Sequence, residues 1–102
     1  MTIQNTNVTT VASNIFAPSG DSVVVTAYFC NYSNATKTVN VYAVPSGGSV
    51  GSGTQILANL SISSGDTYIM TNERLVLGTG EALVANANAN SSITSTVVYT
   101  GV

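Results

Sequence analysis

Charged residues are scarce in this chain. They make up 6% of 102 residues, against roughly 25% in an ordinary soluble domain. The formal net charge is −2, and Lys and Arg together number 2, so the sequence predicts no basic patch and no nucleic-acid partner. Ser, Thr and Asn must supply most of the polar surface. One interpretation is that much of this surface lies against partner proteins, and the alternative is a neutral but soluble β domain.

Histidine is absent and cysteine occurs once, which excludes most chemistry that an active site would need. A lone thiol cannot form an intrachain disulfide, and without histidine it has no base to activate it. Soft-metal sites also require His and Cys. Cys30 lies in the strand-like run VVVTAYFC and is predicted to be a buried, unreactive thiol. The sequence predicts a protein that is not an enzyme and takes no metal and no cofactor.

Long apolar runs are missing as well. No stretch reaches the roughly 18 residues of a membrane helix. The opening MTIQNTNVTT lacks a basic segment followed by an apolar one, as a Sec signal peptide would have. We therefore expect no membrane partner, and a chain that stays in the cytoplasm in which it is made.

What the chain does contain is a β pattern, because Val, Ile, Thr and Tyr dominate and turn residues recur at short intervals. The prediction is an all-β fold, a single immunoglobulin-like β-sandwich of about seven antiparallel strands. Residues 15–102 form the sandwich, and residues 1–14 are either an N-terminal arm or a first strand. A loose strand is expected around 6–17, followed by strands at 22–31, 37–44, 56–62, 67–71, 75–77, 81–87 and 93–100.

Two of these strands carry a prediction about which side chains share a face. Both faces of residues 22–31 are apolar, which is typical of a central strand. Strict alternation puts Val23, Val25, Ala27 and Phe29 on one side and Val24, Thr26, Tyr28 and Cys30 on the other. In residues 37–44 the core face is predicted to hold Val39, Val41 and Ala43, with Asn40 and Tyr42 opposite.

The glycine pair in LVLGTGEALVA is the nearest approach to a motif. A dinucleotide loop needs a third glycine, and a phosphate loop needs a Lys followed by Ser or Thr. Neither follows Gly80, and the acid at Glu81 would repel a phosphate. Residues 78–80 are therefore predicted to form a turn between two strands.

Three segments, taken in order, resemble a known family. They are VVVTAYFCNYSNATKTVNVYAVPSGG, QILANLSISSGDTYIMTNERLVLGTGEALVANA and ITSTVVYTGV. Together they resemble small virion structural proteins of tailed bacteriophages, especially those of marine and cyanobacterial phages. The resemblance covers about residues 22–102 and is most specific at residues 65–68 and at Gly80-Glu81, where the family more often has Asp in place of the Glu.

The resemblance implies a β-sandwich that takes part in a phage particle. The leading hypothesis is a capsid decoration, or cement, protein that binds the outer capsid and bridges neighbouring subunits of the major capsid protein. Many weak contacts multiplied by symmetry would provide its strength. The protein would then reside in the virion, assembled in the host cytoplasm, and act as a homo-oligomer, a trimer by analogy with capsid three-fold positions. The alternatives are a tail, neck or fibre component and a glycan-binding adhesin module.

A particle-binding role predicts contact patches in place of catalytic residues. The candidates come from the N-terminal stretch, the NYSN turn and the Gly/Ser loop at residues 45–53. They are Asn5, Asn7, Val8, Asn31, Tyr32, Ser33, Asn34, Pro45, Ser46, Gly47 and Gly48. Tyr32 is expected to be the best exposed aromatic side chain. If residues 1–12 are an arm, their removal is expected to weaken attachment without unfolding the domain.

Overall fold

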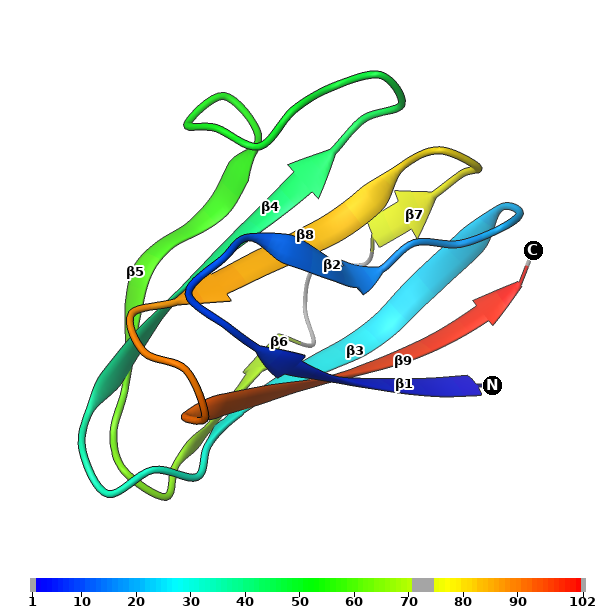
Figure 1. The fold of residues 1–102 in the computed structure, drawn as a ribbon. Coiled ribbons are helices and arrows are strands. Elements are labelled where there is room, and N and C mark those ends of the chain that lie inside the picture. The colour runs from blue at the N-terminus through cyan, green and yellow to red at the C-terminus, as the bar shows by residue number, and fades with distance from the viewer. Residues whose placement is uncertain (1, 71–74, 102) are drawn as a thin grey trace.

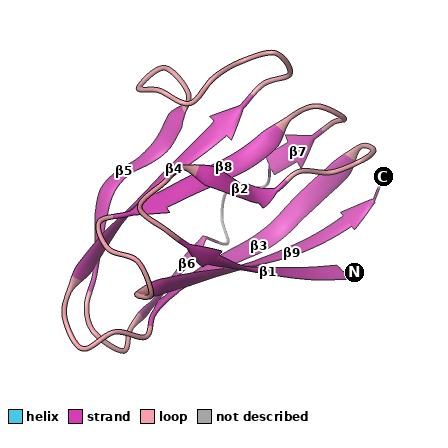
Figure 2. Ribbon diagram, in the orientation of Figure 1, coloured by secondary structure: helices cyan, strands magenta, loops and turns pink. Residues whose placement is uncertain are grey.

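The computed structural model describes residues 2–70 and 75–101, and all regular structure within these two ranges is β-strand (Figure 2). Every described Gly except Gly101 and both Pro residues lie between the strands, and most of the β-branched and aromatic residues lie within them. The strands are β1 (Thr2–Val8), β2 (Ser13–Phe16), β3 (Ser22–Asn31), β4 (Lys37–Val44), β5 (Gln55–Ile62), β6 (Thr67–Met70), β7 (Leu75–Leu77), β8 (Ala82–Ala87) and β9 (Ile93–Gly101).

The strands form two antiparallel sheets. Sheet A has the order β1-β9-β3-β6, with β7 also paired to β3, and sheet B has the order β2-β8-β4-β5. In Figure 1, β1, β9 and β3 run along the lower side of the molecule and sheet B lies above them. The apolar faces of the two sheets pack against each other, because neither sheet alone could shield its inner side chains from water.

The pairing of the strands is nested. β1 pairs with β9, β2 with β8, β3 with β6 and β7, and β4 with β5. This is one long antiparallel ribbon rolled up so that successive pairs fall in alternate sheets. Rolling brings β9 beside β3 and β8 beside β4, which closes both sheets. The arrangement is a jelly roll, in which β6 and β7 together occupy the place of one strand.

The predicted all-β sandwich is confirmed, but its immunoglobulin-like detail is not. The described residues contain nine strands in place of about seven, and the first strand pairs with the last. The expected loose strand at 6–17 is two strands in different sheets, β1 and β2, joined by an exposed corner at residues 9–12. At this corner the Val11 amide donates to Thr9 Oγ1 at 3.2 Å, a local bond that competes with continued pairing. The expected strand at 67–71 is observed as Thr67–Met70, and residue 71 lies outside the described residues.

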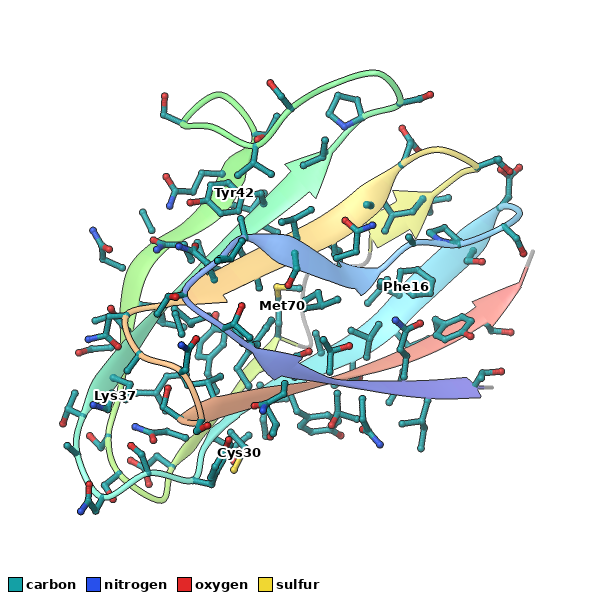
Figure 3. The ribbon with its side chains drawn as sticks, viewed as in Figure 1. Phe16, Cys30, Lys37, Tyr42 and Met70 are labelled. Atoms are coloured by element: carbon teal, nitrogen blue, oxygen red, sulfur yellow. The ribbon has the colours of Figure 1, made fainter. Side chains whose placement is uncertain are left out.

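The hydrophobic core fills the space between the sheets. Figure 3 shows Phe16 and Met70 in this space, and the Phe16 and Tyr99 rings lie 4.4 Å apart between centroids. The two rings are tilted by 44° relative to each other. The core comprises Val8, Ile15, Phe16, Val24, Ala27, Phe29, Val39, Val41, Ile62, Met70, Leu77, Leu83, Ala85, Ala87, Ile93 and Val97.

A β-bulge changes the predicted faces of β3. Its pairing with β9 shifts register between Val24 and Thr26, so one extra residue, Val25, interrupts the alternation. Ala27 and Phe29 face the core, and they share that face with Val24, which strict alternation puts on the opposite side. Val23 was therefore assigned to the wrong face. It lies opposite Val76, whose side chain is 66% exposed.

The remaining predictions about side-chain positions gave mixed results. β3 is a central strand, and β4 directs Val39, Val41 and Ala43 to the core, so both predictions are confirmed. Cys30 was expected to be buried, but it is half-buried on the outer side of sheet A (Figure 3). The bulge does not affect it, because the alternation resumes at Thr26. The strand simply presents its second apolar face to the outside instead of to a core.

The turn at residues 78–80 is confirmed. The Glu81 amide donates to the Gly78 carbonyl at 3.1 Å, and Glu81 Oε1 accepts from the Gly78 amide at 2.6 Å. Glu81 thus closes the turn with two hydrogen bonds to Gly78, since its backbone amide donates one and its side chain accepts the other. Gly80 has a φ of +86°, a conformation that residues with a Cβ resist.

Gly80→Ala is expected to lower the free energy of unfolding by about 1–2 kcal/mol. The positive φ penalises a Cβ, and that Cβ would meet Ser46 Oγ at 2.7 Å. Gly20→Ala is the matched control, because nothing lies within 4 Å of a Cβ there, and it should change stability by no more than about 0.5 kcal/mol. Urea unfolding of both variants measures the difference. Equal stabilities would contradict the described turn.

Candidate interaction surface

The described residues hold no constellation of reactive groups. Among them, no three His, Cys, Asp or Glu side chains lie close enough to share a metal ion. Asp21, Asp66 and Glu81 each belong to a separate turn, and Lys37 begins β4. The surfaces of the two sheets are therefore the places to look for a site.

The outer face of sheet A is defined by the register of its strands. Ile3 lies opposite Val98, which lies opposite Thr26. The next outward row runs Asn5, Thr96, Tyr28, Ile69, and the third runs Asn7, Thr94, Cys30, Thr67. Beyond the bulge, Val23 continues the face together with Val76 and Thr100. We call this set of fourteen residues the outer face of sheet A.

None of the fourteen residues on the outer face of sheet A carries a charge. Ile3 is 62% exposed, Ile69 is 49% exposed and Val76 is 66% exposed, so large apolar side chains meet solvent in each part of the face. Single exposed apolar residues are ordinary, but several on one sheet face without any charge among them are typical of a surface that contacts another protein.

The two asparagines on this face, Asn5 and Asn7, already accept hydrogen bonds from neighbouring side chains. Thr96 Oγ1 donates to Asn5 Oδ1 at 2.9 Å. The Tyr32 hydroxyl donates to Asn7 Oδ1 at 3.1 Å, which links β1 to the turn that follows β3. Because these groups already have partners, covering them with another protein costs less than covering unbonded polar groups.

The NYSN turn is built around Asn31, whose side chain is completely buried. Asn31 Nδ2 donates to the carbonyls of Ile62 at 2.7 Å and Ala35 at 2.9 Å. Asn31 Oδ1 accepts from the Ser33 amide at 2.9 Å and from Ser33 Oγ at 2.6 Å. The amide group thus uses its whole hydrogen-bonding capacity within the fold. Asn31 holds the turn in place and has no free group for a partner.

The other candidates from the sequence fall in different positions. Val8 is completely buried, whereas Asn5 and Asn7 lie on the outer face of sheet A. Tyr32 is 50% exposed, more than the other large aromatic side chains for which an exposure is given, in line with the expectation for it. Asn34 is exposed and Ser33 is half-buried.

The Gly/Ser loop lies at the opposite end of the sandwich from the NYSN turn, as Figure 1 shows for the β4–β5 and β3–β4 connections. Pro45, Ser46, Gly47 and Gly48 are exposed there. Next to them is an open pocket of about 420 Å³ between the sheets, lined by Ala43, Val44, Pro45, Gly53, Thr54, Val76, Leu77 and Glu81. The predicted candidates therefore do not form one patch, because the two groups of loops are separated by the length of the strands.

The residues that sequence reasoning missed are the apolar ones on the outer face of sheet A: Ile3, Val23, Tyr28, Ile69, Val76 and Val98. A signal was present, since both faces of residues 22–31 are apolar. That pattern was taken only as a mark of a central strand. A central strand of a two-sheet sandwich has just one face on the core, so the second apolar face indicated an exposed surface.

Sheet B has a different outer face, rich in amides. Asn40 Oδ1 accepts from Gln55 Nε2 at 2.9 Å and from the Asn59 amide at 2.7 Å. Asn86 lies opposite Asn40, and its buried Oδ1 has no hydrogen-bond partner among the described residues. The half-buried Tyr42 lies two residues further along the same face of β4 (Figure 3).

Within residues 2–70 and 75–101, no helix has the length and apolarity that a membrane crossing would need. Comparison with protein-family models, with curated proteins and with solved structures found no match to this chain. The geometry defines the class of protein, an all-β jelly-roll sandwich with an uncharged, partly apolar sheet face. The resemblance to phage virion proteins stays a prediction.

Proposed function

We propose that this protein is a non-catalytic structural subunit that packs against other proteins in an assembly, and specifically a virion protein of a tailed phage that decorates the capsid. The observation that carries the proposal is the outer face of sheet A, which is uncharged and exposes apolar side chains from several strands. Supporting it, jelly rolls occur in viral capsid domains, although a fold alone does not determine a function.

The mechanism of such a protein is binding. The whole chain exposes 5170 Å², and a standard interface takes about 800 Å² from each partner, which is about a sixth of that surface. One contact of that size on each of several neighbouring subunits, repeated by particle symmetry, would hold a shell together without strong individual contacts. The major capsid protein is the proposed partner, and a tail, neck or fibre protein is the alternative.

Co-sedimentation of the purified protein with expanded capsids that lack it tests this proposal, with isolated tails as the parallel sample. Stoichiometric binding to heads, with better survival of the heads on heating, is the expected result. Binding to tails alone would move the function to the neck or fibre. Binding to neither would overturn the virion role.

The variant Ile69→Lys is expected to weaken particle binding at least tenfold. Ile69 is 49% exposed on the outer face of sheet A, and a lysine there would place an unpaired charge in the contact. Ile56→Lys is the matched control, because Ile56 is 42% exposed but belongs to β5 in sheet B. Binding titrations of both variants give the comparison. An equal loss in the two would show that sheet A is not the contact surface.

Removal of residues 1–12 is not a simple test of attachment to a particle. The deletion takes away the whole of β1, which pairs with β9, and with it the buried side chain of Val8. A loss of binding would then be inseparable from a loss of folded structure.

A second function is favoured by the outer face of sheet B, namely glycan binding by an adhesin module. The half-buried ring of Tyr42 offers a sugar an aromatic surface, and the side-chain amides of Asn40 and Gln55 lie beside it. A glycan array probed with the wild-type protein and with Tyr42→Ala tests it. Binding that Tyr42→Ala abolishes would establish this function, and no binding to any glycan would remove it.

A further inference from the structure

The edges of the two sheets differ in how well they are protected against pairing with another strand. A sheet edge presents unpaired backbone N–H and C=O groups, and proteins usually shorten, bulge or charge their edge strands to prevent pairing. The described strands that border the sheets are β1 on one side of sheet A, β6 and β7 on the other, and β2 and β5 in sheet B.

Three of these edges carry a protecting feature. β6 and β7 have four and three residues. β2 has four residues and a register shift between Asn14 and Phe16. β5 is longer, but its pairing with β4 is irregular at two points, and Asn59 within it has a φ of +50°. Each of these strands is too short or too irregular to pair along its length with a strand of another chain.

β1 has none of these features. It has 7 residues, TIQNTNV, and pairs with β9 in an unbroken register from Thr2 to Val8. It contains no charged residue and no proline. Its outward-facing side chains Ile3, Asn5 and Asn7 are exposed. β1 is thus a regular and uncharged edge strand whose outward-facing side chains meet solvent.

We propose that a second copy of this chain pairs with this edge. The two β1 strands run antiparallel about a two-fold axis, which extends sheet A without interruption from one sandwich into the other. Such a contact is isologous and closes on itself, so it yields a dimer and not a fibre. The proposal goes beyond the particle-binding role, since it concerns contacts between copies whatever surface they join.

Geometry fixes the register of the pairing. A two-fold axis perpendicular to the sheet keeps outward-facing side chains on the same face in both copies, so residues of like parity lie opposite each other. Only the register centred on Asn5 pairs all seven residues of the strand. It sets Asn5 opposite Asn5, Ile3 opposite Asn7, Gln4 opposite Thr6 and Thr2 opposite Val8.

The placement of the charged residues leaves this edge open to a second copy. The chain carries a net charge of −2, so two copies repel at long range. The described charged residues lie in the turns and at the start of β4, however, and none belongs to β1 or to its neighbour β9. No like charges meet in the proposed contact. One seven-residue strand pair buries less than the roughly 800 Å² per partner of a standard interface, so the dimer is expected to form at micromolar concentrations.

Sedimentation velocity on the full chain over a range of concentrations tests the proposal. The wild type is expected to pass from monomer to dimer in the micromolar range. Asn5→Lys should raise the dissociation constant at least tenfold, because it sets two like charges directly opposite each other. Asn34→Lys makes the same change at an exposed turn residue and should leave the dimer intact. Urea unfolding of Asn5→Lys establishes that the variant is folded.

A cross-link tests the register itself. In a Cys30→Ser background, Asn5→Cys is expected to form a disulfide-linked dimer under mild oxidation, because residues directly opposite in antiparallel strands have Cβ atoms about 4.5–5.5 Å apart. Asn34→Cys in the same background should not cross-link. A wild type that stays monomeric up to millimolar concentration would overturn the proposal. A dimer whose dissociation constant Asn5→Lys leaves unchanged would also overturn it. Protection of the β1 amides from hydrogen exchange only when capsids are added would overturn it as well, because the edge would then pair with a capsid protein and not with a second copy.

The dimer and the particle role can fail separately. Sedimentation is measured without any particle, so a monomeric protein that still binds capsids would overturn the pairing alone. A dimer that binds neither heads nor tails would overturn the virion role alone.

Discussion

Phe29→Ala is expected to lower the free energy of unfolding by about 4 kcal/mol. The Phe29 side chain is completely buried between the sheets, where it lies in the same row as Tyr68 and the buried Ser95. Its removal loses the transfer free energy of the ring and leaves a cavity that the two sheets cannot close. A domain of this size is stable by roughly 5–15 kcal/mol, so the variant should remain folded but unfold at much lower urea.

Tyr28→Ala is the matched control, because it removes a similar ring from the next residue of the same strand. Tyr28 points to the outer face of sheet A and is 37% exposed, so its loss should cost only about 1 kcal/mol. Urea unfolding of both variants measures the two losses in unfolding free energy, and the midpoints can be compared directly if the m-values are equal. Similar losses at both positions would contradict the assignment of faces in β3.

Asn31→Asp is expected to cost about 3 kcal/mol of unfolding free energy, although the two side chains have the same shape. Asn31 Nδ2 donates to two carbonyl oxygens, those of Ala35 and Ile62. A carboxylate would place an oxygen against both carbonyls, remove the Asn31 donor from each and bury a charge as well, and only the Ala35 carbonyl would keep a second side-chain donor, Ser33 Oγ. The turn that connects β3 to β4 should loosen first.

Asn34→Asp makes the same chemical change three residues further on, where the side chain is exposed. It should alter stability by no more than about 0.5 kcal/mol. Urea unfolding, together with hydrogen exchange of the Ser33 amide, checks both variants. An Asn31→Asp protein as stable as the wild type would mean that the described bonds of Asn31 are not formed.

Most of the strands could be predicted from local patterns. Residues 22–31 and 37–44 have the β-branched residues and flanking turns that define strands, and both are observed with those bounds. The turn at residues 78–80 followed from its glycines in the same way. These features depend on a few neighbouring residues, which the sequence presents directly.

The nested topology could not be read from the same patterns. Which strands pair depends on contacts between residues far apart in the chain, such as Thr2 with Tyr99. The division of residues 6–17 between two sheets depends on a corner at residues 9–12 that contains neither Gly nor Pro. The bulge at Val25 has no local signal either, because the residue lies in the uniform run Val23–Val25.

The candidate surface was only partly predictable for a related reason. Polar turn residues were favoured as contacts, yet Asn31 proved to be bonded within the fold. The apolar residues Ile3, Ile69 and Val76 come from three strands and become one face only when the register is known. Asn5 and Asn7 were selected as part of the N-terminal stretch, and they lie on that face beside Ile3.

The nested order of strands also determines when the protein can fold. β9 lies between β1 and β3 in sheet A, so sheet A stays divided until residues 93–101 have left the ribosome. The core lacks Ile93 and Val97 until the same moment. A chain whose first strand must wait for its last has a high contact order, and folding in milliseconds to seconds is the expected consequence. During that interval the growing chain presents unpaired edges to other chains, so the rate of synthesis and access to chaperones are expected to govern how much of it reaches the folded state.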